Sequence, residues 1–424
     1  MEYTEEIRCL LWLVMVFGAG NPKIWEILRH HETPQKSCAA LQASDASAHI
    51  KLDDKQWRRI RQTKAEQVEM MLKQCHSLDI SILWYGDEAY PEQLYAVVNA
   101  PVLLFYQGDI SLLQDHLLLT VVGTREPTEY SLRVEKQICG ELVVENFVLV
   151  TGFAAGIDIT ANLCAIQAGK PSIALMGCGL DVNYPRTHFN LKREIAKNGL
   201  ILSEFLPGTS PRPSNFPLRN RVLSGLSMGT MVIQAPSRSG ALITAACALE
   251  QGRDVFCVPP ADIFDKRYQG VVKYLRDGAT PVFDSRDIVY AYYTSHAHMI
   301  DAAALYEEKP KMSESMVMTL GEPKTSSSSK HTKKKSERGT KQASEQAPTP
   351  ELPTETEIDE TPETESMDAA SEMVLKLIQK SQVVHLDMIA TETGLPMDQL
   401  IVTLTELELL GKIERIPGKQ FRII

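Results

Sequence analysis

The chain has 424 residues, and at about 100–200 residues per domain this length predicts two or three domains. It carries 44 Lys and Arg against 54 Asp and Glu, so its net charge of −10 excludes a uniformly basic nucleic-acid coat and confines any polyanion site to a local patch. The longest apolar run, Leu10 to Gly20, is shorter than the ~20 residues of a membrane span, and Glu5 and Glu6 precede it where a signal peptide would be basic. We therefore expect a cytoplasmic protein without membrane contact.

Cysteine and histidine spacing bears on metal chemistry. The eight cysteines include no C-x-x-C pair, and the ten histidines show no H-E-x-x-H spacing. Most cysteines have apolar neighbours, which is typical of reduced, buried thiols. We therefore predict no metal and no cofactor.

The first segment, residues 1–77, has a helical pattern. Ile7, Leu10, Leu11 and Val14 recur at helical spacing, and the turn at 18–22 contains two glycines and a proline. This predicts a small helical domain of SAM or helix-hairpin-helix type. Two interpretations of the turn stay open: its backbone N–H groups contact a DNA phosphate, or it simply connects two helices.

The second segment, residues 78–295, alternates short apolar strands with helices, which is typical of a parallel α/β sheet. The expected strands are Ile80–Trp84, Val102–Tyr106, Leu117–Val122, Phe147–Val150, Ser172–Leu175, Leu200–Ser203, Thr230–Ile233 and Val255–Val258. The fold class is therefore α/β with a Rossmann-like parallel sheet core, and its ligand is expected at the carboxyl ends of the strands.

Four strand-end loops in this domain carry glycines, arginines and aromatic residues. They are Gly123-Thr124-Arg125, the stretch 151–158, the stretch 177–190, and 216–221 together with 237–240. Glycine lets a backbone approach a ligand, arginine pairs with phosphate, and aromatic rings stack on bases. The residues expected to cradle phosphate are Gly123, Thr124, Gly152, Gly156, Gly177, Gly179, Ser239 and Gly240. Because a parallel sheet brings such loops to one edge, we predict a single polynucleotide site.

Catalytic interpretations of the same loops are weaker. The sequence has no G-x-x-x-x-G-K-[ST], and Gly152 to Gly156 has the wrong spacing for a dinucleotide fingerprint. The G-x-S-x-G match at 225–229 follows a helical stretch and precedes a strand, the reverse of a hydrolase elbow. Asp158 and Asp181 are interpretable as paired carboxylates, although an Asp at a helix start more often caps it.

Residues 296–368 have few apolar side chains. A basic cluster at 330–341 is followed by an acidic one at 351–365, so we predict a disordered linker. A solvated tether is favoured over a phosphate contact for the basic cluster.

The last segment, residues 369–424, predicts three helices and a hairpin, a winged-helix layout. Its third helix, at 397–410, carries Asp398, Glu406 and Glu408 and no basic residue. We therefore expect this module to contact protein rather than DNA.

The middle domain resembles the DprA/Smf family, the DNA-processing proteins of bacterial natural transformation. The motifs that carry the resemblance are Gly123-Thr-Arg125, Thr151-Gly-Phe-Ala-Ala-Gly-Ile-Asp158, Tyr184-Pro185, Ser203-Glu204, Phe216-Pro-Leu-Arg-Asn-Arg221 and Ser239-Gly-Ala-Leu-Ile-Thr244. The resemblance implies a cytoplasmic homodimer without enzymatic turnover. Such a protein binds and shields incoming single-stranded DNA and helps to load the RecA recombinase, with single-strand-binding protein as a further partner.

The resemblance also implies which residues contact DNA. Arg125 is similar to the arginine of the family's first glycine loop, Arg186 and Phe189 to the cation and stacking ring after Tyr-Pro, and Arg219 and Arg221 to the Arg-Asn-Arg pair. These five are the expected DNA-binding residues, and the pairing and stacking chemistry of their side chains agrees with that role.

Two alternatives remain. The sheet type also resembles the nucleoside-monophosphate phosphoribohydrolases, nucleotide-binding Rossmann proteins whose chemistry needs a glutamate after a glycine-rich turn; nothing from Ser239 to Leu249 is a carboxylate. A pure protein adaptor working through the acidic winged helix would leave the arginine cluster without a purpose.

Overall fold

The computed structural model describes residues 3–43, 50–300 and 369–423, the last range with gaps at 382, 397–399, 401–402, 405–406, 409–411 and 417–419. The described residues fall into two compact units, one before and one after Lys311. Apart from its first five residues, the predicted linker at 296–368 lies outside the described residues.

The first unit begins with five helices. They are α1 (Glu5–Phe17), α2 (Pro22–His31), α3 (Pro34–Gln42), α4 (Asp54–Gln62) and α5 (Ala65–Ser77). The hydroxyl of Thr4 caps α1, and Leu10, Leu11 and Leu13 are fully buried because α1 is apolar around most of its circumference. Among the helices that the structure describes, none is long and apolar enough to cross a membrane.

A nine-stranded mixed sheet follows, in the order β1-β2-β6-β5-β4-β3-β7-β8-β9. Its strands are β1 (Ser81–Trp84), β2 (Leu103–Gly108), β3 (Leu117–Val122), β4 (Phe147–Thr151), β5 (Ser172–Met176), β6 (Leu200–Ser203), β7 (Gly229–Val232), β8 (Asp254–Cys257) and β9 (Thr280–Pro281). The α/β class and the predicted strands are confirmed. The sheet is parallel from β6 to β9, whereas β2 runs antiparallel to both β1 and β6. The two-residue β9 was not predicted, because so short an element carries no periodic signal.

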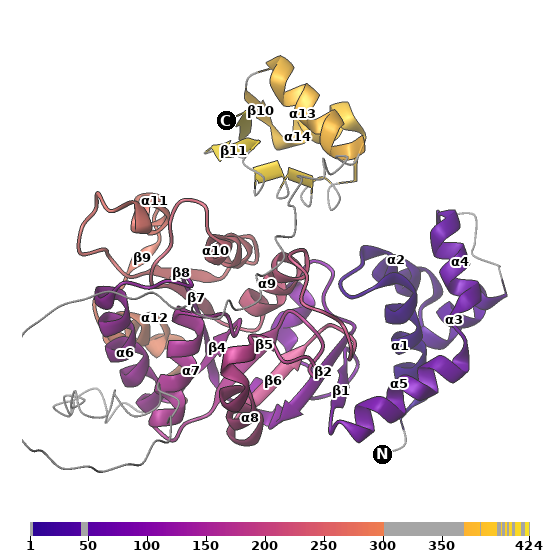
Figure 1. Cartoon of the computed structure of the whole chain (residues 1–424), viewed down its shortest axis with the longest axis horizontal. Coiled ribbons are helices and arrows are strands. Elements are labelled where there is room, and N and C mark those ends of the chain that lie inside the picture. Colours follow the sequence, from indigo (N-terminus) through magenta and orange to yellow (C-terminus); the bar gives the residue numbers. More distant parts are fainter. Residues whose placement is uncertain are drawn as a thin grey trace, which may run out of the picture. The chain divides into compact units, whose positions relative to one another are not determined.

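Helices cover both faces of this sheet (Figure 1). They are α6 (Glu129–Val144), α7 (Ile157–Gln167), α8 (Phe189–Asn198), α9 (Asn215–Gly225), α10 (Gly240–Glu250), α11 (Gln269–Arg276) and α12 (Ser285–His296). Side chains of β3 alternate between the faces: Leu119 packs in the cluster that contains residues of α6, α7 and α12, and Leu118 in the cluster that contains residues of α9 and α10. Both faces are buried, which explains why the central strands are continuously apolar.

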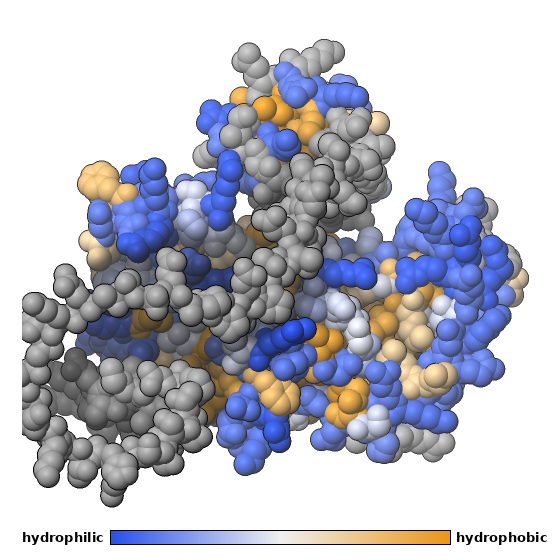
Figure 2. All heavy atoms as spheres, viewed as in Figure 1, coloured by the Kyte–Doolittle hydropathy of each residue, from blue (hydrophilic) through white to orange (hydrophobic). Residues whose placement is uncertain are grey.

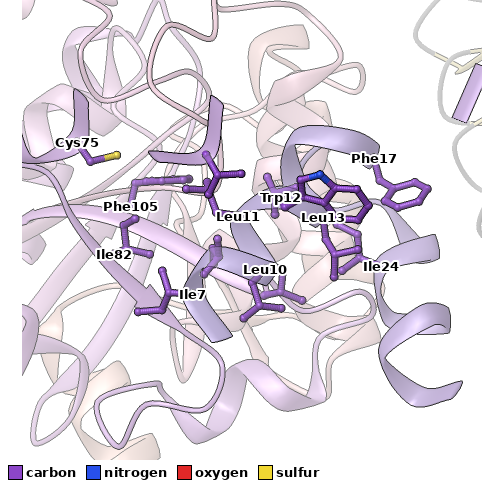
Figure 3. Close-up of a cluster of buried hydrophobic side chains, with 14 of the residues drawn as sticks. Ile7, Leu10, Leu11, Trp12, Leu13, Phe17, Ile24, Cys75, Ile82 and Phe105 are labelled. Atoms are coloured by element: carbon purple, nitrogen blue, oxygen red, sulfur yellow. The ribbon is translucent and has the colours of Figure 1, made fainter. Parts of the chain in front are cut away.

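The five front helices share one apolar core with the edge of the sheet. Ile7 and Leu11 of α1 belong to the same buried cluster as Ile82 of β1 and Phe105 of β2 (Figure 3). A hydrogen bond of 2.6 Å from the Trp25 indole to the carbonyl of residue 100 adds a polar contact between the two parts. The helical segment and the sheet are therefore packed as one body.

The second unit has the winged-helix elements that the sequence predicts. They are α13 (Ala369–Ser381), β10 (Val383–His385), α14 (Leu386–Thr393), β11 (Ile413–Ile416) and β12 (Gln420–Ile423). The strands form an antiparallel sheet in the order β10-β12-β11 around a core that includes Ile378, Ile389 and Phe421. Much of the predicted third helix, including Asp398 and Glu406, lies outside the described residues, as does the turn at 417–419.

Candidate nucleic-acid interface

Helix α9 holds three of the predicted strand-end loops. The Asn215 amide donates to the carbonyl of Gly177 at 3.1 Å, and the Asn220 amide donates to the carbonyl of Gly240 at 3.3 Å. Arg219 donates from Nη1 to the carbonyl of Gly152 at 2.7 Å. The loops that follow β4, β5 and β7 are therefore tied to successive side chains of one helix, at the carboxyl edge of the sheet.

The first loop touches the second directly. The amide of Ile157 donates to the carbonyl of Thr124 at 3.3 Å. Gly156 has φ +84°, and a Cβ there would lie 2.4 Å from the Thr124 oxygen, so only glycine permits this approach. Gly123 packs beside the Ile157 side chain, and Gly179 of the third loop donates from its amide to the carbonyl of Thr209 at 2.9 Å.

Gln234 fastens both ends of the loop that carries Arg125. Its backbone carbonyl accepts the amide of Thr124 at 2.8 Å, and its side-chain oxygen accepts the amide of Thr128 at 2.9 Å. Gln234 is 1% exposed, so water does not compete for these bonds. The loop is therefore shaped by a buried amide to which sequence analysis assigned no role in the site.

The two arginines of α9 have protein partners. Arg219 is 5% exposed and also donates to the carbonyl of Leu175. Both carboxylate oxygens of Glu204 accept from Nη2 of Arg221 at 2.7 Å, and Glu204 also accepts the backbone amide of Gly20. Sequence analysis expected both guanidinium groups at the ligand surface, and the structure directs them inward, so their direct contact with DNA stays a prediction.

Burial shifts the charge equilibria around Arg219. It lowers the pKa of Arg219 to about 10, although the nearby Asp158 carboxylate opposes the shift. It raises the pKa of Asp158 to about 6, with Arg219 and the backbone amides of residues 152 and 154 opposing. Asp158 lies in the first turn of α7 and accepts the amide of Ala154, in the loop before the helix, at 3.2 Å. The N-cap of α7 is Gly156, so the expected capping role of Asp158 is wrong. Asp181 instead accepts the amide of Gly208 at 2.7 Å.

Phe216 is the aromatic centre of the interface. The guanidinium carbon of Arg125 lies 5.9 Å from its ring centroid, and that of Arg219 lies 6.0 Å from it. The ring of Tyr184 packs on it with centroids 5.7 Å apart. Sequence analysis quoted Phe216 only as part of a motif; its position three residues before Arg219 on a helix was the signal that it contacts a cation. Arg125 itself is exposed, which leaves its outer side open to a ligand.

The segment after Tyr184 presents Arg186 and Phe189. Both are exposed, Phe189 at 45%, and Arg193 lies over the Phe189 ring at 5.9 Å. The segment is fixed from inside by Lys192, whose ammonium donates to the carbonyls of residues 180 and 182 at 2.5 and 2.9 Å. Burial lowers the pKa of Lys192. Arg186 and Phe189 are thus exposed on a segment whose backbone is held by the hydrogen bonds of Lys192.

The structure also locates Ser239, Gly240 and the G-x-S-x-G match that the sequence analysis considered. The hydroxyl of Ser239 caps α10 by accepting the amide of Ala241 at 3.3 Å, and Gly240 beside it borders open space. The serine of the G-x-S-x-G match, Ser227, is 1% exposed and bonds the Thr120 hydroxyl at 2.8 Å. Since α9 ends and β7 begins at the two glycines of that match, its interpretation as a helix-to-strand turn is confirmed.

Two family models and the curated relatives identify one family. A family model described as DNA recombination-mediator protein A matches residues 81–293, and a DprA winged helix domain model matches residues 358–419. The chain is 38% identical over 209 residues to the DNA processing protein DprA of Bacillus subtilis, which covers 49% of this chain and 70% of that protein. It is 42% identical over 205 residues to that of Streptococcus pneumoniae, which covers 48% and 71%. The X-ray structure of DprA from Streptococcus pneumoniae matches with a TM-score of 0.59 at 29% identity, over 68% of this chain and 98% of that one. The phosphoribohydrolase interpretation is not favoured.

Proposed function

The chain belongs to the DprA/Smf family of DNA-processing proteins, and from this premise we propose that its middle domain binds single-stranded DNA on the loops that α9 holds together. The observation that carries the proposal is the pairing of Arg125 with Phe216, an exposed guanidinium over an aromatic ring at 5.9 Å. A cation on a ring, with glycine loops around it, suits a phosphate next to an unstacked base.

Binding is independent of sequence in this proposal. Arg125 and Arg186 neutralise phosphates, and Phe189 stacks a base with a gain of roughly 1–3 kcal/mol. The amides of Thr124 and Gly179 already donate to carbonyls within the protein, so these two loops are proposed to shape the site rather than to bond phosphate. Duplex DNA binds less well because its bases are already stacked on one another.

Arg219 and Arg221 act by positioning in this proposal. The guanidinium of Arg219 fixes the second glycine loop, and that of Arg221 is paired with Glu204 at 2.7 Å. Loss of either arginine therefore weakens DNA binding by displacing loops rather than by removing a phosphate contact.

The downstream role follows the family. We propose that the protein shields incoming single strands during natural transformation, helps to load the RecA recombinase and acts as a homodimer without enzymatic turnover. Single-strand-binding protein is a further proposed partner. In a dimer, one strand bound in the first pocket is held near the second pocket. The second binding step is then intramolecular, so the dimer binds a long strand more tightly than one pocket does.

A titration of a fluorescent single strand and the matching duplex across a salt series tests the proposal. Arg125→Ala/Arg186→Ala is expected to weaken single-strand binding and to lower the salt slope by about 1.4, since each lost phosphate contact on a single strand contributes about 0.7. Arg276→Ala, an exposed cation on α11, is the matched control. Equal binding of single strand and duplex, or a double variant indistinguishable from the control, would contradict the proposed site.

A further inference from the structure

Helix α4, in the front part of the chain, carries a dense group of exposed cations. We call this group the α4 basic face, and its six members lie within or beside α4, with two carboxylates in the same stretch. The members are Lys51, Lys55, Arg58, Arg59, Arg61 and Lys64. The stretch is therefore strongly positive in a chain whose net charge is −10.

The packing of α4 explains why these cations face solvent. Ile60 is 5% exposed and belongs to the front core, and Trp57 packs against that core. Lys55, Arg58 and Arg61 are spaced three residues apart along the helix, and all three are exposed. Figure 2 shows a hydrophilic surface where Figure 1 labels α4.

Three cations elsewhere in the front helices, Arg8, Lys23 and Lys36, have acidic partners. Arg8 pairs with Glu69 at 2.7 Å, and Lys23 pairs with Glu26 at 2.6 Å. Within the residues that the structure describes, no ion pair involves Lys55, Arg58 or Arg61. Of the two carboxylates in the stretch, that of Asp53 is engaged in capping α4 by accepting the amide of Gln56.

Unpaired like charges three or four residues apart repel and weaken a helix. An anion lying across them removes that repulsion, and arginine in particular binds phosphate through paired N–H groups. We propose that the α4 basic face is a second nucleic-acid contact, which binds the phosphate backbone of a DNA single strand outside the Arg125 pocket. This inference goes beyond the proposed function, because it assigns DNA contact to a surface that shares no residue with that pocket.

The test compares two strand lengths across a salt series. A strand of about ten nucleotides, the scale of one binding groove, reports on one contact, and a strand of about sixty reaches several. Arg58→Glu/Arg61→Glu is expected to weaken binding of the long strand about ten-fold and to lower its salt slope by about 1.4. Binding of the short strand to the Arg125 pocket is expected to stay unchanged.

Two controls keep the result interpretable. Lys273→Glu/Arg276→Glu changes the net charge equally on exposed positions of α11 and is expected to bind the long strand as wild type does. Arg58→Lys/Arg61→Lys keeps the charge and is expected to retain most of the affinity. Far-ultraviolet circular dichroism and the melting temperature of each variant exclude unfolding as the cause of a loss.

The outcomes separate this inference from the proposed function. If Arg58→Glu/Arg61→Glu binds the long strand like the α11 control, the α4 basic face is not a DNA contact and the inference is overturned. If Arg125→Ala/Arg186→Ala leaves short-strand binding intact while the α4 variant loses long-strand binding, the pocket fails and the α4 basic face stands.

Discussion

Arg219 donates a hydrogen bond from its buried guanidinium to the carbonyl oxygen of Gly152 at 2.7 Å. A Cβ on residue 152 would lie 2.5 Å from Nη2 of Arg219, so the glycine and the arginine depend on each other. Arg219 therefore fixes the loop of Gly152 from the inside of the protein, and we call it a brace. Its loss is expected to lower both the free energy of unfolding and the affinity for DNA.

Arg219→Ala is expected to lower the free energy of unfolding by about 3–5 kcal/mol, because it leaves the Asp158 carboxylate and two carbonyls without their buried cation. Urea unfolding of the full chain measures the effect. Arg125→Ala removes an exposed guanidinium and is expected to change stability by no more than about 0.5 kcal/mol. Equal stability losses in the two variants would show that Arg219 is not a brace.

Asp158→Asn is expected to change how stability depends on pH. The pKa of Asp158 is raised to about 6 in the folded chain from 3.8, so the folded state favours the protonated acid. The contribution of Asp158 to the free energy of unfolding is therefore fully present below about pH 4. It is lost as the pH rises to about 6, and the total loss is about 3 kcal/mol. The stability of wild type relative to Asp158→Asn should fall across that window in urea titrations. Hydrogen bonds from Ser111 lower the pKa of Asp109, so the same comparison with Asp109→Asn should be flat above pH 4.

Gln234→Met is expected to loosen the Arg125 loop, since methionine fills the site but gives the amide of Thr128 no acceptor. A buried donor left unpaired costs about 1–3 kcal/mol. Hydrogen exchange at residues 124–128 should accelerate, and single-strand affinity should fall several-fold. Gln137→Met, on the exposed face of α6, is the control and should change neither measurement.

Lys192→Met is expected to release the segment that presents Arg186 and Phe189, because two carbonyls lose the ammonium that holds them. The cost in unfolding free energy is about 2 kcal/mol, and single-strand affinity should fall with it. Lys197→Met changes an exposed lysine of the same helix and should leave both quantities as in wild type. A stable Lys192→Met variant with full affinity would refute this supporting role.

Glu204→Gln is expected to loosen the contact between the front helices and α9. The carboxylate accepts from both Arg221 and the amide of Gly20, so its loss leaves a buried cation unpaired at a cost of about 3–5 kcal/mol. Faster hydrogen exchange at residues 18–21 would report the opening. Glu26→Gln breaks the more exposed pair with Lys23 and should cost no more than about 1 kcal/mol.

The central fold could be predicted because its signals are local. Leu117–Val122 is an apolar run between a polar stretch and a glycine, and β3 has the same bounds in the structure. The antiparallel placement of β2 could not be predicted in the same way, because strand direction depends on which sheet edge the hairpin with β1 joins. In the structure β1 and β2 join the edge of the sheet at β6, where side chains of both strands share a buried cluster with α1.

The site was predictable in outline and not in its interior. Glycines at strand ends indicated where backbones meet, and Gly156 does approach the loop of Arg125. The burial of Arg219 depends on how α9 packs over the ends of β4 and β5, which no residue spacing encodes. The sequence around an arginine does not distinguish a guanidinium that binds phosphate from one that donates to two buried carbonyls.

The apolar core that α1 shares with β1 and β2 also limits how this protein divides into modules. A chain shortened to begin at Ser81 would keep every strand of this sheet. It would lose α1, so the side chains of Ile82 and Phe105 would become exposed to water. Such a fragment would expose an apolar surface on β1 and β2, and exposed apolar surface promotes aggregation. The first 77 residues thus cover an apolar part of the sheet, and a truncation at this boundary would separate the two sides of one core.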